Sequence, residues 1–209
     1  MKTLHLSKVI VLLIVALNSY SPADAEVIYE SSTMGPTGQT TGTIISNKQF
    51  FGSRFYISQQ TQVTAIGGHL AGCHIQGGIF GAIVSIDSFS DFPNGHPFNT
   101  TEVIAYKVFT PTFPSSDYRT SFSAELSPGY YALVFGSGLY GAKSETYMPA
   151  LGQTDLSSGQ YIFWDGYYDS AWKNVIYGMG RFVVEGTVVP EPSSLLLFSL
   201  GAAIVRKRR

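Results

Sequence analysis

Along residues 26–187, apolar and polar side chains alternate in short runs that glycine, proline, asparagine and serine interrupt. In Arg119–Leu126, for example, Phe122, Ala124 and Leu126 share one parity, and the positions between them are polar. Because successive side chains of a strand point to opposite faces, this pattern predicts half-buried β-strands. The predicted strands are Glu26–Glu30, Gly42–Ser46, Phe50–Ser58, Gln62–Ala71, Gly78–Asp87, Glu102–Thr110, Arg119–Leu126, Tyr130–Phe135, Gln160–Trp164 and Arg181–Thr187.

Between these strands the sequence has no convincing run of apolar residues at helical spacing. About ten short strands without intervening helices predict an all-β fold, an antiparallel β-sandwich of jelly-roll-like type. The turn Ser127-Pro128-Gly129 is expected to join Arg119–Leu126 to Tyr130–Phe135 as a pair, because proline presets φ and glycine accepts positive φ. Asp91–Pro97 and Gly136–Ser158 are expected to be loops.

The first 25 residues have the pattern of a secretory signal peptide. An initial segment with two lysines is followed by the apolar run Val9–Leu17 and then by the small residues Ala23 and Ala25. This order predicts a signal helix and cleavage by signal peptidase before Glu26. Nine apolar residues span about 14 Å as a helix, less than the ~30 Å hydrocarbon core of a bilayer. An uncleaved anchor is the alternative.

The last 22 residues form a second unusual segment, at 188–209. Pro190, Glu191 and Pro192 come first, and the prolines keep this part of the chain extended. The apolar run Leu195–Val205 is predicted to be a short hydrophobic helix, too short for a durable membrane span. A basic cluster ends the chain and predicts a cytoplasmic C-terminus, with the body on the other side of the membrane. That cluster consists of Arg206, Lys207, Arg208 and Arg209.

This tail resembles the PEP-CTERM sorting signal of Gram-negative bacteria. The resemblance implies that an exosortase recognises Pro190, Glu191 and Pro192 and that the chain stays in the inner membrane only transiently. It also implies a setting of exopolysaccharide and biofilm production, with release to the cell surface or the extracellular space. The body, in segments such as LSPGYYALVFGSGLYGA and YIFWDG, resembles small β-sandwich domains found ahead of such tails. That second resemblance implies a fold and no activity.

Composition and charge limit the classes of function that are possible for the body, residues 26–187. Of all 209 residues of the chain, only 13% are charged and 14% are aromatic. Between Glu26 and Val189 there are seven Lys/Arg and twelve Asp/Glu, a formal charge of −5. Without a basic stripe to contact phosphates, nucleic-acid binding is excluded as a function.

Two groups of polar residues could carry chemistry, and the sequence favours structural roles for both. His69, Cys73 and His74 have the spacing H-x3-C-H, but on a strand His69 and Cys73 lie about 13 Å apart. Zinc needs four converging ligands, so no metal site is predicted there. Asp165 and Asp169, with Asp155, leave a calcium ion as an open alternative. No catalytic residue and no cofactor is predicted.

Seven aromatic residues cluster near the end of the body. They are Tyr161, Phe163, Trp164, Tyr167, Tyr168, Trp172 and Tyr177. Core packing and a glycan-binding surface both explain such a cluster. Tyr167, Tyr168 and Trp172 are expected to be the exposed members, because Gly166 and Ser170 indicate a turn.

These observations predict a non-enzymatic exported protein with a structural or adhesive role at the surface or in the extracellular matrix. The alternative is a carbohydrate-binding module that uses the exposed aromatic residues on exopolysaccharide. A hydrolase is the third hypothesis.

Overall fold

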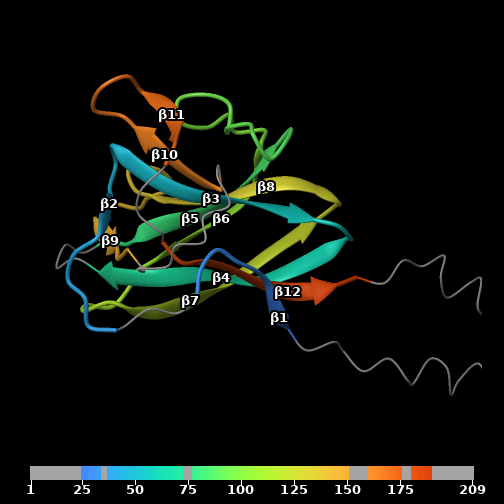
Figure 1. Cartoon of the computed structure of the whole chain (residues 1–209), viewed down its shortest axis with the longest axis horizontal. Helices are drawn as coiled ribbons and strands as arrows, with labels where there is room; N and C mark the ends of the chain where they lie inside the picture. Colours follow the sequence, from blue (N-terminus) through green and yellow to red (C-terminus); the bar gives the residue numbers. More distant parts are fainter. Residues whose placement is uncertain (1–24, 34–36, 73–76, 151–159, 176–179, 190–209) are drawn as a thin grey trace, which may run out of the picture.

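The computed structural model describes residues 25–33, 37–72, 77–150, 160–175 and 180–189, which fold into twelve β-strands (Figure 1). Among these residues no helix is long and apolar enough to cross a membrane. The strands are β1 (Glu26–Glu30), β2 (Thr43–Ile45), β3 (Gln49–Ile57), β4 (Thr61–Gly72), β5 (Ile79–Ile86), β6 (Val103–Phe109), β7 (Ser116–Leu126), β8 (Gly129–Gly136), β9 (Thr146–Met148), β10 (Tyr161–Asp165), β11 (Ala171–Asn174) and β12 (Phe182–Val188).

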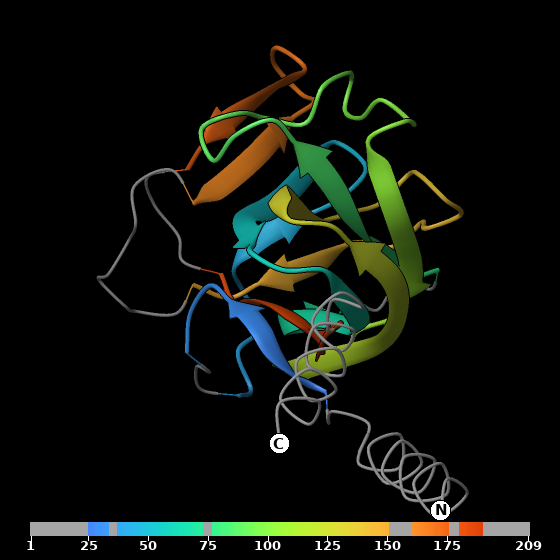
Figure 2. The same ribbon diagram turned by 90° about the vertical axis from the view of Figure 1, so that its right-hand side faces the viewer.

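The strands form two sheets of six (Figure 1, Figure 2). Sheet 1 has the order β1-β12-β4-β9-β2, with β7 paired to β4, and sheet 2 has the order β11-β10-β3-β8-β5-β6. All of the pairings between these strands are antiparallel. The predicted all-β antiparallel fold with two sheets is therefore confirmed. The predicted signal helix and C-terminal helix lie outside the described residues.

All ten predicted strands are present, with ends displaced by at most three residues. Two strands were not predicted. β9 lies inside the stretch Gly136–Ser158 that was expected to be a loop, and β11 follows the turn after Asp165. These strands have only three and four residues, too few to show an alternating pattern.

The expected pairing across Ser127-Pro128-Gly129 is wrong. β7 pairs with β4 in sheet 1, whereas β8 pairs with β3 and β5 in sheet 2. The turn therefore carries the chain from one sheet to the other. A turn sequence fixes the reversal of direction but not the partner, and both edges of β8 are already occupied.

The main hydrophobic core lies between the two sheets. Phe135 occupies its centre, stacked on Phe182 with ring centroids 5.2 Å apart and edge-on to Phe109 at 5.8 Å. A second apolar cluster covers the outer face of sheet 2, where Phe50, Phe80 and neighbouring residues pack against the loop between β5 and β6. Sheet 2 is thus apolar on both faces, and residues 87–102 form a third layer over it.

Tyr29 of β1 links sheet 1 to sheet 2 through its hydroxyl. That hydroxyl lies 2.6 Å from the Ser53 hydroxyl and accepts a hydrogen bond from the Gln160 side-chain amide. Its ring stacks on Phe55 at 5.1 Å. Burial raises the pKa of Tyr29 to about 12, and burial also raises the pKa of Tyr161.

These shifts predict an alkaline loss of stability. Below pH ~10 the Tyr29 hydroxyl is protonated in both the folded and the unfolded protein. Above pH ~10 it ionises in the unfolded chain but stays protonated in the folded protein. The free energy of unfolding therefore falls as the pH approaches the pKa of the folded protein. Tyr29 alone should account for a loss of about 2 kcal/mol between pH 10 and 12, measured by urea unfolding. In Tyr29→Phe stability at neutral pH should be lower, but the alkaline decline should be shallower. An equally steep decline in both proteins would assign the effect to other groups.

Candidate functional site

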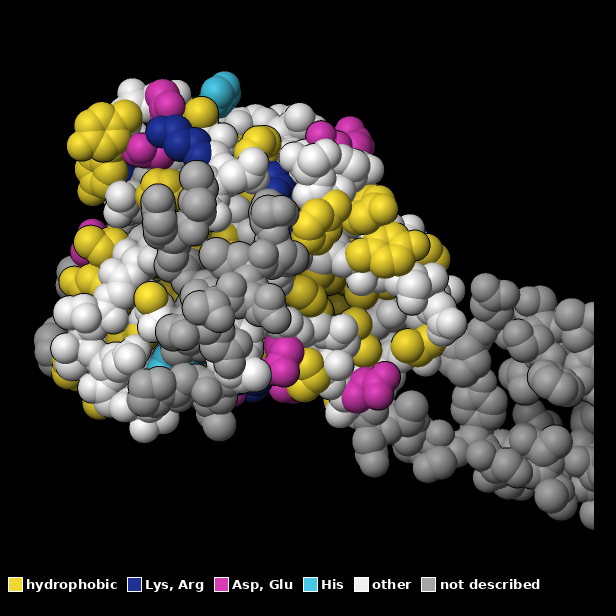
Figure 3. Space-filling view, viewed as in Figure 1, with side chains coloured by type: hydrophobic (Ala, Val, Ile, Leu, Met, Phe, Trp, Pro, Cys, Tyr) yellow, Lys and Arg dark blue, Asp and Glu magenta, His cyan; other side chains and the backbone are white. Residues whose placement is uncertain are grey.

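Two exposed tyrosines stand at the turn between β10 and β11, at one edge of sheet 2. We call residues 166–170 the tyrosine turn. The exposed fraction is 61% for Tyr167 and 88% for Tyr168. At the upper left of Figure 3, over this turn, hydrophobic side chains protrude beside acidic and basic ones. Exposed apolar surface bordered by charged groups is typical of interaction sites, so this turn is a candidate for one.

The tyrosine turn is held in shape by two carboxylates and one ammonium group. Oδ1 of Asp165 accepts the backbone N–H groups of Tyr167 and Tyr168 at 3.1 and 3.3 Å. The Lys173 ammonium lies 3.3 Å from Oδ2 of Asp165 and 3.1 Å from Oδ2 of Asp169. The hydrogen bond that the Lys173 ammonium donates to the Asp169 carboxylate raises the pKa of Lys173. The tyrosines therefore project from a braced turn, which limits the entropy lost on binding a partner.

Beneath the turn lies an aromatic platform that joins it to the loop between β5 and β6. The Trp172 indole N–H donates to the Pro97 carbonyl at 2.8 Å, and its ring lies 5.6 Å from that of Trp164. Nδ1 of His96 donates to the Ser170 carbonyl at 3.0 Å, and its ring lies 5.7 Å from Trp164. In both views this loop runs beside the β10–β11 hairpin (Figure 1, Figure 2).

The three aromatic residues predicted to be exposed thus lie in two different environments. Tyr167 and Tyr168 are exposed, whereas Trp172 is only partly exposed and packs against the second apolar cluster. Sequence reasoning missed His96 and Lys173 as parts of the site. The signal for Lys173 was its spacing of four residues from Asp169, whereas nothing local indicated the contact of His96 with a residue 74 positions away.

The other residues considered from the sequence lie elsewhere. His69 is fully buried, with Nε2 3.2 Å from the Ser115 hydroxyl. Cys73, His74 and Asp155 lie outside the described residues, as does Tyr177. Asp165 and Asp169 contact the Lys173 ammonium instead of converging with further carboxylates. Within the described ranges no group of three or more His, Cys, Asp or Glu side chains is placed to hold a metal ion.

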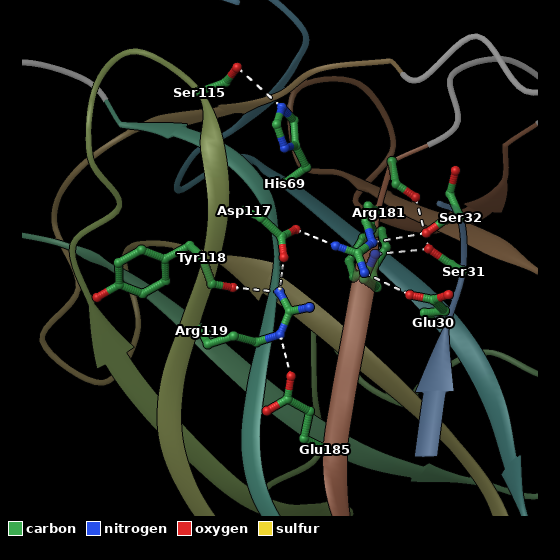
Figure 4. Close-up of polar contacts among 12 residues, drawn as sticks. Glu30, Ser31, Ser32, His69, Ser115, Asp117, Tyr118, Arg119, Arg181 and Glu185 are labelled. Atoms are coloured by element: carbon green, nitrogen blue, oxygen red, sulfur yellow. Dashed lines mark hydrogen bonds and ion pairs between the residues drawn. The ribbon is translucent and has the colours of Figure 1, made fainter. Parts of the chain in front are cut away.

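A larger cluster of charges crosses the outer face of sheet 1 (Figure 4). Arg119 contacts Glu185 at 2.7 Å and Asp117 at 2.9 Å, and Asp117 also pairs with Arg181. Arg181 continues the series to Glu30 at 2.7 Å. The chain of ion pairs ties β7, β12 and β1 together across β4. Since each charge has an internal partner, the cluster stabilises the sheet and is a poor candidate for binding or catalysis.

The sequence features tied to export lie at the ends of the body. Ala25 and Glu26 are exposed where β1 begins, while Ala23 lies outside the described residues. Pro190, Glu191, Pro192 and the four terminal cations also lie outside them. The last described residue, Val189, donates its backbone N–H to the Gln60 carbonyl at 2.8 Å. The tail therefore leaves directly from the end of β12.

Residues 188–209 match the PEP-CTERM protein-sorting motif. The resemblance of the tail is therefore confirmed. The PEP-CTERM motif indicates an exported protein with an exosortase as its processing partner, and a precursor anchored in the membrane before it reaches the cell surface or the exterior. The match covers the tail and none of the body before Val188. No curated protein matches the chain.

Proposed function

We propose that this PEP-CTERM protein is a non-enzymatic, adhesive component of the cell surface or extracellular matrix and that the tyrosine turn is its contact surface for exopolysaccharide. The single observation that carries the proposal is the exposure of Tyr167 and Tyr168 on a turn braced by Asp165 and Lys173. A tyrosine ring offers an apolar face to the C–H groups of a sugar and a hydroxyl to its polar edge.

The surroundings of the turn suit a polymer better than a small substrate. The two rings are largely exposed at the end of a hairpin, whereas small ligands usually bind in concave pockets. The nearby carboxylates are engaged by backbone N–H groups and by Lys173, which favours binding over acid–base chemistry. We therefore assign no catalytic step and no cofactor to the site.

A dedicated carbohydrate-binding module is the second candidate, and strand order favours it. Eight strands form the orders β1-β12-β4-β7 and β3-β8-β5-β6 in the two facing sheets. This is the order of a double-sheet jelly roll, an architecture shared by many lectin domains. The argument is one of fold-level analogy, so the site itself must decide between adhesion and specific recognition.

The topology proposed for the precursor follows from its ends. Signal peptidase is proposed to cut between Ala25 and Glu26. The terminal cations Arg206–Arg209 are proposed to stay in the cytoplasm. Removal of the tail is then proposed to release the body, which acts in a biofilm setting.

The proposal is tested on the secreted protein, which mass spectrometry should show to begin at Glu26 and to end near Pro190–Ser194. Calorimetric titration with exopolysaccharide from the host should detect binding. The double variant Tyr167→Ala/Tyr168→Ala should bind about tenfold more weakly, which corresponds to ~1.4 kcal/mol. Tyr56→Ala, which removes a ring that is 54% exposed at the other end of sheet 2, is the control and should bind normally.

Saturable binding at one stoichiometric site would favour a dedicated module, and weak binding that grows with polymer length would favour adhesion. An absence of binding by the unaltered secreted protein, or equal affinity of the double variant, would contradict the proposed role of the tyrosine turn.

A further inference from the structure

The chain enters and leaves the body at the same end of the sandwich. Glu26, the first residue of β1, pairs with Gly186 of β12, and Val188 pairs with Thr61, the first residue of β4. β1 begins and β12 ends at the right-hand side of Figure 1, next to the β3–β4 turn. We call this part of the body, with residues 58–60 at its centre, the tether end.

The tether end must lie close to the membrane while the tail is in place. Six Cα–Cα steps join Val189, which is fixed to Gln60, to Leu195, where the apolar run of the tail begins. At ~3.6 Å for each step, a fully extended chain spans at most about 22 Å. Part of that distance is taken up by the headgroup layer, which adds roughly 5–8 Å on each side of the hydrocarbon. Little free chain remains between the body and the lipid surface.

Two tyrosines are exposed at the tether end. Tyr56 and Tyr130 are cross-strand partners near the end of β3 and the start of β8, with ring centroids 4.9 Å apart. Their exposed fractions are 54% and 37%, and Val27 and Val188 are exposed nearby on sheet 1. In Figure 3 hydrophobic side chains gather over these ends of β3 and β8. Tyrosine is the type of residue that is enriched in the interfacial layer of membranes.

The charged residues at the tether end indicate which forces could hold it against a lipid surface. Glu26 is exposed there, and Glu125, which pairs with Gln62 across the sheet, accepts a hydrogen bond from the Gln60 side chain. Carboxylates do not attract anionic headgroups, so the contact depends on the rings and on the short tether. Salt should therefore not weaken the contact, because what it screens is the repulsion between these carboxylates and anionic headgroups.

We infer that the tether end is a membrane-docking surface and that Tyr56 and Tyr130 rest in the lipid headgroup layer while the precursor is anchored. The inference depends on the sorting motif and not on glycan binding. It also orients the proposed site. Asp165 pairs with Gln49 at the opposite end of β3, and the eight steps from Gln49 to Ile57 span about 26 Å at ~3.3 Å each. The tyrosine turn thus faces away from the membrane.

The test uses the full-length precursor reconstituted in vesicles of phosphatidylethanolamine and phosphatidylglycerol. Cys73, the sole cysteine of the chain, is replaced by serine, and a fluorophore is attached to Ser58→Cys or, as the matched control, to Lys48→Cys. Both positions are exposed, and they flank β3 at its two ends. Lipids with a nitroxide on the headgroup should quench the label at position 58 several-fold more than the label at position 48.

A second variant tests the rings themselves. Adding Tyr56→Ser and Tyr130→Ser to the Ser58→Cys protein should reduce this quenching, whereas about 1 M salt, where the Debye length is ~3 Å, should not reduce it. Equal quenching at positions 58 and 48 would overturn the inference, as would quenching that survives loss of both rings. A precursor that fails to float with the vesicles would overturn it too, since docking requires the tail. The glycan titration uses the secreted form, so the two proposals fail independently.

Discussion

Arg54→Met should lower the free energy of unfolding by about 2–4 kcal/mol, because it removes charge-assisted hydrogen bonds from a buried guanidinium to three partly buried acceptors. Arg54 is fully buried on β3, and burial lowers its pKa. Its guanidinium donates to the carbonyl of Asp91 at 2.7 Å, to the carbonyl of Ser90 at 3.3 Å and to the side-chain oxygen of Asn174 at 2.9 Å. It also lies 4.6 Å from the centre of the Phe92 ring.

The change is measured by urea unfolding and by the melting temperature, which should fall by roughly 10 °C for a body of this size. Proteolysis within residues 87–102 should accelerate, since Arg54 anchors that loop to sheet 2. Lys107→Met, which removes an exposed cation from β6, is the control and should change stability by less than about 0.5 kcal/mol. A loss below about 1 kcal/mol in Arg54→Met would mean that the loop is held by its aromatic contacts instead.

The alternation of apolar and polar residues could not predict that Arg54 is buried. The two-residue period of a strand shows which side chains share one face of the sheet, but it does not show which other segment covers that face. Part of the signal was present, because β5 and β8 are apolar on both parities, as in the runs IFGAIV and YYALVF. Strands buried on both faces have this pattern. The covering segment is an irregular loop, and its contact with Arg54 joins residues 37 positions apart.

The strands were predictable because each carries its own periodicity, whereas their partners were not. The Ser127-Pro128 turn shows the difference, since the same residues can close a hairpin or cross between sheets. The candidate site likewise has a part that the local sequence indicated and a part that depends on distant contacts. Gly166 and Ser170 indicated the turn that exposes Tyr167 and Tyr168, but Trp172 is fixed by the Pro97 carbonyl, a partner 75 residues away.

Gly67→Ala is expected to produce the other large loss of stability, about 3 kcal/mol or more. Gly67 lies in the middle of β4, paired with Arg119 of β7 and Val183 of β12. A Cβ atom there would collide with the Tyr118 carbonyl oxygen and lie only 3.0 Å from Cδ of Arg119. The first of these contacts is with backbone of a paired strand, so it cannot be relieved by a side-chain rotation. The missing side chain also leaves room for Arg119 to reach Glu185 across β4.

Gly129→Ala is the matched control for that substitution, because it adds the same methyl group to a glycine at the start of β8. The nearest atoms to its added Cβ would be those of the Tyr131 ring, at 3.6 Å, which is ordinary contact. Its stability should change by less than about 1 kcal/mol, and a small gain is compatible with the reduced freedom of the unfolded chain. Urea unfolding of both variants measures the difference. If Gly67→Ala were as stable as Gly129→Ala, β7 could move away from β4 at little cost. Loss of the ion pairs of Arg119 would then have no measurable effect on stability.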